Sequence, residues 1–91
     1  MKYTIRFSGQ FKKSYKLCQR RGYDMTKIQT VIRILSEKGA LPAEYRPHIL
    51  SGKWVGILEC HVDSDWLLLG KRNENELTLL LLDTGTHSDV F

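Results

Sequence analysis

The spacing of the apolar residues changes twice along this chain, and these changes limit the folds that it can adopt. Tyr3, Ile5 and Phe7 alternate with polar residues, and this period of two predicts a strand over residues 2–7 with one buried face. The next segments have helical spacing, and the apolar runs after residue 52 are again only as long as strands. Helices and strands segregated in this way predict an α+β domain.

Two amphipathic helices are expected between the first strand and residue 40. The first spans about residues 9–21, with Ser8 as its N-cap and Gly22 at its end. Its apolar stripe consists of Phe11, Tyr15 and Cys18. The second follows Asp24, a good N-cap, and ends at Gly39. Its apolar face consists of Met25, Ile28, Val31, Ile32 and Leu35. Two such helices in succession predict an antiparallel pair packed on one sheet.

The remainder of the chain is expected to form the larger part of that sheet. Both prolines, Pro42 and Pro47, fall within residues 40–52, which we therefore expect to be an ordered loop. Three apolar runs follow, separated by short polar turns: residues 53–62, 66–72 and 77–82. Short turns join antiparallel neighbours, so these runs predict a three-stranded antiparallel meander, followed by a polar tail over residues 83–91.

The length and composition of the chain indicate one small globular domain, residues 1–91. The sequence is 42% hydrophobic and 26% charged, and its apolar runs are too short to cross a membrane. The amino-terminal segment lacks the continuous apolar stretch of a signal peptide, so we expect the protein in the cytoplasm. In that reducing compartment Cys18 and Cys60 stay as thiols, and their spacing does not favour a zinc site.

The charges are distributed unevenly along the chain. Residues 1–53 hold 12 Lys or Arg against three Asp or Glu, whereas residues 54–91 hold two against seven. The first part therefore carries a formal charge of +9 and the second a charge of −5. A basic surface of this kind attracts a polyanion such as RNA, DNA or an acidic protein. The alternative is a pair of solvated helices whose polar faces carry lysine.

The three histidines are the groups that exchange protons near neutral pH without a large pKa shift. His48 lies in the proline-bounded loop, His61 near the end of a predicted strand and His87 in the tail. The predicted meander can return the chain so that His61, Asp65 and His87 meet at one edge of the sheet. The alternative is three unrelated imidazoles on the surface.

The sequence lacks the motifs of several common catalytic sites. It has no Gly-x-Ser-x-Gly elbow, no phosphate-binding glycine-rich loop and no His-Glu-x-x-His helix. Acid/base chemistry on an anionic substrate remains, and RNA suits it because its 2′-hydroxyl is an internal nucleophile. Trp54, Trp66 and Phe91 are candidates for stacking on a base, although both tryptophans are more typical of a core.

Five segments of the chain resemble, in order and spacing, the YafQ branch of the RelE/ParE toxin superfamily. They are FSGQFKKSYK (7–16), YRPHILSGKW (45–54), ECHV (59–62), DWLLL (65–69) and TGTHSDVF (84–91). The resemblance covers nearly the whole chain. It implies a RelE-like fold and a bacterial type II toxin that cuts mRNA in the ribosomal A site. It also implies neutralisation by a cognate antitoxin, through which the complex binds operator DNA, and no metal or other cofactor.

The resemblance also implies roles for individual residues. His48 corresponds to the general base and His87 to the general acid, while His61 and Asp65 orient groups and balance charge. Phe91 corresponds to a residue that stacks on the substrate or anchors the tail. The cations that we expect to contact RNA are Lys12, Lys13, Lys16, Arg20, Arg46, Lys53 and Lys71.

Three positions depart from the family pattern. The family often has Arg at Asp83, Arg at Leu58 and Tyr at Gly70, so two candidate phosphate-binding cations and a phenol are missing. A catalytically weakened toxin that still binds antitoxin and ribosome is therefore the alternative to an active mRNA endoribonuclease. A gyrase poison on the same fold is a third reading, and it is disfavoured because that branch does not need the histidines.

Overall fold

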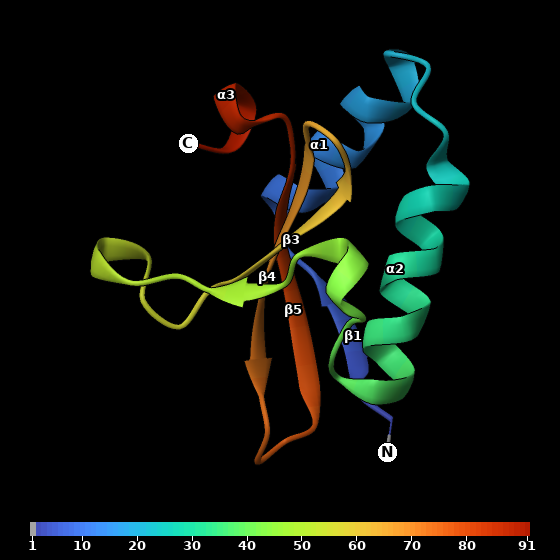
Figure 1. Cartoon of the computed structure of the whole chain (residues 1–91). Helices are drawn as coiled ribbons and strands as arrows, with labels where there is room; N and C mark the ends of the chain where they lie inside the picture. The colour runs from blue at the N-terminus through green and yellow to red at the C-terminus, as the bar shows by residue number, and fades with distance from the viewer. Residues whose placement is uncertain (1) are drawn as a thin grey trace.

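The computed structural model describes residues 2–91, and it contains one mixed sheet of five strands (Figure 1). Across the sheet the order is β1-β5-β4-β3-β2. The strands are β1 (Thr4–Phe7), β2 (His48–Ile49), β3 (Leu58–Asp63), β4 (Trp66–Asn73) and β5 (Thr78–Gly85). Strands β3, β4 and β5 form the expected antiparallel meander, and β1 pairs with β5 in parallel. The predicted α+β fold class is confirmed.

The helices α1 (Gly9–Arg20) and α2 (Met25–Lys38) begin and end close to where the sequence places them. The Ser8 side chain accepts a hydrogen bond from the Phe11 N–H, and Asp24 accepts one from Thr26. Gly39 ends α2 in the left-handed conformation, with φ 69°. Both helices lie on one face of the sheet.

The main core fills the space between these helices and the sheet. Its fully or almost fully buried residues are Phe11, Cys18, Ile28, Val31, Leu35, Leu58, Cys60, Val62, Trp66, Leu68, Leu79 and Leu81. The strand members alternate along β3, β4 and β5, as expected for one face of a pleated sheet. Cys18 and Cys60 both lie in this core as free thiols, and burial raises the pKa of Cys60 to about 12.

The opposite face of the sheet carries a smaller apolar cluster under a third helix, α3 (His87–Val90). Val90 packs against Leu67 and Leu69 in this cluster. Residues 83–91, expected to be a polar tail after the last strand, instead contain the end of β5 and helix α3. Strand β5 continues to Gly85, and Thr86 and Asp89 form a capping box that starts the helical turn.

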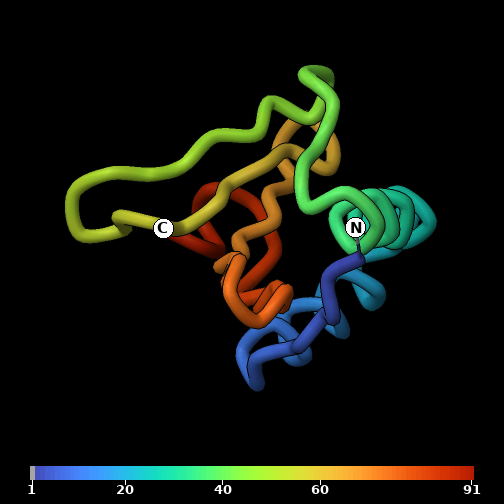
Figure 2. The backbone as a smooth tube through the Cα atoms, turned by 90° about the horizontal axis from the view of Figure 1, so that it is seen from below, coloured from blue at the N-terminus to red at the C-terminus, as the bar shows by residue number. Residues whose placement is uncertain are grey.

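The segment between α2 and β3 also differs from the expected loop and strand. It contains the short 3₁₀ turns η1 (Ala43–Tyr45) and η2 (Gly52–Trp54), with β2 between them, and β3 begins only at Leu58. Gly52 and Gly56 have positive φ angles of 69° and 83°, which interrupt an extended strand. Figure 2 shows this segment reaching away from the helices toward the C-terminus.

Among the helices described in residues 2–91, none combines the length and the apolar character needed to span a membrane.

Candidate active site

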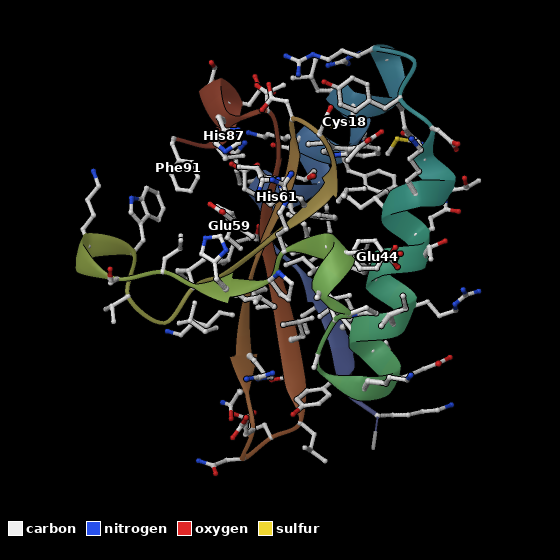
Figure 3. All side chains as sticks on the ribbon, viewed as in Figure 1. Cys18, Glu44, Glu59, His61, His87 and Phe91 are labelled. Carbon is white, nitrogen blue, oxygen red and sulfur yellow. The ribbon has the colours of Figure 1, made fainter. Side chains whose placement is uncertain are left out.

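The fold brings the three histidines together on the sheet face that is opposite α1 and α2. His61 lies on β3 and His87 at the start of α3 (Figure 3). His48 lies on the adjoining strand β2. In the β2–β3 pair, His48 stands directly across from Glu59. Because residues two apart on a strand share a face, Glu59 and His61 point to the same side.

His48 is held by acceptors at both of its ring nitrogens. Its Nε2 lies 2.9 Å from the Glu59 Oε1, and its Nδ1 lies 3.2 Å from the carbonyl oxygen of Arg46. Glu59 is a nearly buried carboxylate with only 7% of its surface exposed. Glu59 and the Arg46 carbonyl thus fix the orientation of the His48 ring.

His61 occupies the centre of the cluster and is held as a neutral ring. Its Nδ1 lies 3.3 Å from the Arg46 Nη2, and a guanidinium only donates, so the proton of the neutral ring is on Nε2. That Nε2 is 3.9 Å from Glu59. Burial, and then the neighbouring Arg46 charge, lower the pKa of His61 below its ordinary value.

His87 is fixed by Asp65 through two contacts. The His87 Nδ1 lies 2.7 Å from the Asp65 Oδ1, and the His87 backbone N–H donates to the same oxygen at 3.1 Å. These hydrogen bonds lower the pKa of Asp65, which keeps it ionised. The His61 and His87 rings are 5.9 Å apart between centroids. With Nδ1 engaged, Nε2 is the His87 atom that remains for a substrate.

Two aromatic rings border the histidines. Trp54, on η2, and Phe91 meet edge to face with their centroids 5.3 Å apart, and the Lys53 Nζ lies 5.6 Å from the Trp54 ring. Phe91 is half exposed and remains accessible for stacking. Trp66 is a core residue, because its ring packs on Tyr23 and its Nε1 donates to the Thr84 hydroxyl.

The cations expected to contact RNA divide into separate groups. Arg46 contacts His61, and Lys53 lies beside Trp54, so both belong to the histidine side. Lys71 borders a hollow at the β3–β4 edge. The others, Lys12, Lys13, Lys16 and Arg20, are exposed on α1, across the sheet from the histidines. The structure does not bring this last group together with the site.

The three departures from the family pattern all lie toward the helices. Asp83 accepts hydrogen bonds from the Ser14 hydroxyl on α1, at 2.5 Å, and from the Thr84 N–H, at 2.8 Å. Leu58 belongs to the main core. A Cβ at Gly70 would lie 3.4 Å from a Leu79 methyl, and the β4–β5 register shifts between Leu69 and Gly70, as it does at a β-bulge.

Glu59 is the site residue that the sequence reasoning missed. The signal that could have identified it is its position two residues before His61, which puts both on one strand face. Within residues 2–91, no group of three or more His, Cys, Asp or Glu side chains is arranged to hold a metal ion.

A mixed five-stranded sheet with two helices on one face and a short helix on the other is the architecture of RelE-like toxins. The chain belongs to the family described as bacterial toxin of type II toxin-antitoxin system, YafQ, whose model matches residues 3–91. It is 39% identical over 88 residues to the mRNA interferase toxin YafQ of Escherichia coli K12, covering 96% of this chain and 94% of that protein.

Similarity to solved structures supports the same family assignment. The chain resembles YafQ from E. coli strain BL21(DE3) with a TM-score of 0.90 and 37% identity, covering 98% of both chains. It also resembles a chain of the E. coli DinJ-YafQ complex with a TM-score of 0.88 and 38% identity, again over 98% of both chains. The expected family and fold are therefore confirmed.

Proposed function

We propose that this toxin is an endoribonuclease that cuts mRNA on the ribosome by histidine acid/base catalysis, without a metal ion. The observation that carries the proposal is the continuous polar cluster. His48 reaches Glu59 at 2.9 Å, and the His61 and His87 rings are 5.9 Å apart. A relative with 39% identity is named an mRNA interferase toxin, which supports RNA as the substrate.

In the proposed reaction the His48 Nδ1 exchanges its contact with the Arg46 carbonyl for a ribose 2′-hydroxyl and removes the proton of that hydroxyl. The 2′-oxygen forms a bond to the adjacent phosphorus, and the bond from phosphorus to the 5′-oxygen breaks. The proton uptake converts His48 to the imidazolium, whose charge the Glu59 carboxylate at Nε2 balances. Glu59 therefore assists the base in the way that a buried carboxylate assists histidine in a catalytic triad.

His87 completes the proposed reaction as the general acid. Asp65 accepts from its Nδ1, and the Nε2 proton passes to the leaving 5′-oxygen. The products are a 2′,3′-cyclic phosphate and a 5′-hydroxyl. The Arg46 guanidinium, placed beside His61, supplies positive charge for the phosphorane. His61 and Asp65 thus orient the groups and balance their charge, and Phe91 stacks on a base or anchors the tail.

We also propose the partners of this reaction. The ribosome positions the mRNA, which compensates for the small binding surface of a 91-residue protein. The similarity to the DinJ-YafQ complex supports a neutralising complex with a cognate antitoxin, which in turn binds operator DNA. The lysines and arginine on α1 face ribosomal RNA or this acidic partner. These partners place the protein in the cytoplasm.

Cleavage of mRNA on programmed ribosomes tests the proposal directly. We expect the purified protein, first dialysed against EDTA and then returned to ribosome buffer, to cut the A-site codon. His87→Ala is expected to slow single-turnover cleavage by about 10²–10⁴-fold. His87 is an exposed side chain, so the variant should remain folded. Absence of cleavage by the unmutated protein would contradict the proposed function, and equal rates for both proteins would exclude His87 as the acid.

A further inference from the structure

We propose that Arg21 is a positioning residue for His87, and that it acts through Asp89. The inference rests on the proposed function, in which His87 is the general acid. It concerns a contact between the end of α1 and the short helix α3, which no motif in the sequence indicated. Within residues 2–91, neither Arg21 nor Asp89 forms a hydrogen bond or ion pair with His48 or His61.

The contact is a paired ionic interaction between elements far apart in the sequence. The Arg21 Nη1 lies 2.6 Å from the Asp89 Oδ2, and the Nη2 lies 3.2 Å from the Oδ1. Two parallel hydrogen bonds of this kind fix orientation as well as distance. Arg21 is also the C-cap residue of α1, so its backbone is held by Leu17 and the body of the helix.

The same carboxylate also builds the first turn of α3. The Asp89 Oδ2 accepts from the Thr86 N–H at 2.9 Å, while the Thr86 hydroxyl accepts from the Asp89 N–H at 3.2 Å. Helix α3 has only four residues, and a helix this short is not stable without contacts to the rest of the protein. Arg21 therefore anchors the capping box that shapes the turn.

His87 is the first residue of this turn, directly after the capping Thr86. Its backbone N–H and its Nδ1 both meet the Asp65 Oδ1, so a rotation of α3 would break two contacts together. Gly85 packs closely against the Asp89 side chain, since a Cβ at position 85 would lie 2.8 Å from the Asp89 Cβ and Oδ2. The position of Asp89 thus determines where the His87 ring lies.

Both partners are partly exposed, with 36% of the Arg21 side chain and 27% of the Asp89 side chain accessible. Exposed ion pairs generally contribute little to global stability. The contact is therefore suited to orient α3 without deciding whether the domain folds. Its effect should appear in the placement of His87 rather than in the unfolding temperature.

The test compares Arg21→Gln with Arg33→Gln and Arg21→Lys. Arg33 is an exposed arginine on α2 for which the described residues provide no ion pair, so its variant has the same change of charge. Three measurements are made on each protein: the thermal unfolding midpoint, the NMR signals of the His87 ring with their pH titration, and the single-turnover cleavage rate on programmed ribosomes.

We expect Arg21→Gln to move the His87 signals and to slow cleavage about 10- to 100-fold, because small displacements of a reacting group have effects of this size. Its unfolding midpoint should match that of Arg33→Gln. Arg21→Lys should recover part of the rate, since an ammonium still attracts Asp89. Identical His87 signals and rates in Arg21→Gln and Arg33→Gln would overturn the inference. So would a slower cleavage rate in Arg21→Gln that is fully explained by a smaller fraction of folded protein.

The NMR measurement separates this inference from the proposed function. If the unmutated protein cuts no mRNA, the proposed function fails, but a shift of the His87 signals in Arg21→Gln alone would still support the role of Arg21. If the unmutated protein cuts mRNA and the His87 signals do not respond to Arg21→Gln, the positioning role is wrong and the proposed function stands.

Discussion

The two faces of the sheet differ in what holds them together. The face under α1 and α2 is a continuous apolar core that runs through three strands and both long helices. The opposite face has only a small apolar cluster, in which Val90 of α3 covers Leu67 and Leu69. Beside this cluster, Glu59 and His61 face a polar surface that includes His48 and His87.

The helix face of the sheet thus stabilises the fold, and the opposite face carries the groups of the proposed reaction. Apolar burial on the helix face stabilises the fold through many contacts that no single residue dominates. On the other face, directional contacts place titratable groups at fixed distances, and each group depends on one or two partners. Changes on the first face should therefore alter the free energy of unfolding, and changes on the second should alter the reaction.

The largest expected effect comes from removing a buried leucine from the main core. Leu67 and Leu68 are neighbours on β4, both almost fully buried, but they point to opposite faces. Leu68→Ala should lower the free energy of unfolding by about 2–5 kcal/mol and leave the activity of the folded protein unchanged. Urea denaturation and single-turnover cleavage measure the two quantities.

Leu67→Ala is the matched variant for this comparison. It removes the same atoms from the cluster under α3, so we expect a smaller loss of stability and a clear loss of cleavage, because Val90 no longer packs firmly. Equal effects of the two variants on both stability and cleavage would show that the faces are not separate in function.

A moderate effect is expected at Asp83, where the family often has arginine. Asp83→Arg removes the acceptor of the Ser14 hydroxyl and of the Thr84 N–H, which should lower the free energy of unfolding by about 1–3 kcal/mol. Asp83→Asn keeps an acceptor oxygen and should lose less. Chemical denaturation and the cleavage rate are measured for both. A stable Asp83→Arg protein that cuts mRNA much faster than the unmutated toxin would instead support the alternative hypothesis, in which the unmutated toxin is catalytically weakened.

The smallest expected effect concerns the titration of His61. Arg46 is one cause of its lowered pKa, so Arg46→Gln should move this pKa up toward the ordinary value of 6.5. NMR titration of the His61 ring measures the change, with Lys53→Gln as the control. An unchanged pKa of His61 in Arg46→Gln would show that the Arg46 charge does not affect this histidine.

The same pKa links the site to stability. Because folding lowers the pKa of His61, the unfolded chain binds more protons below pH 6.5, and the contribution of His61 to stability is lost as the pH falls through its folded-state pKa. Arg46→Gln should make this loss smaller. Urea denaturation between pH 7 and pH 5 tests the sign.

The sequence was most informative where structure is local. The caps at Ser8, Asp24 and Gly39 predicted both long helices because capping depends on neighbouring residues. The meander followed from short turns in the same way. Helix α3 escaped prediction because a single turn has no periodicity, and its anchor, Arg21, lies 68 residues away from Asp89.

The site was predictable only in part for a similar reason. The meander allowed a meeting of His61, Asp65 and His87 without requiring it, and the roles of the individual residues came from a resemblance to known toxins. The contact between His48 and Glu59 depends on the register of β2, a strand of two residues that no sequence pattern reveals. The parallel pairing of β1 with β5 joins distant segments, and such long-range pairing has no local signal.

The pairing of β1 with β5 also sets an order of events during synthesis. Strand β1 has no neighbour other than β5, and β4 lacks one of its two neighbours until β5 arrives. Strand β5 follows all the other strands along the chain, so the sheet closes only after β5 has been made. His87 and Asp89 follow β5 along the chain and are made after it. A nascent chain that still lacks β5 and α3 therefore has no assembled histidine cluster.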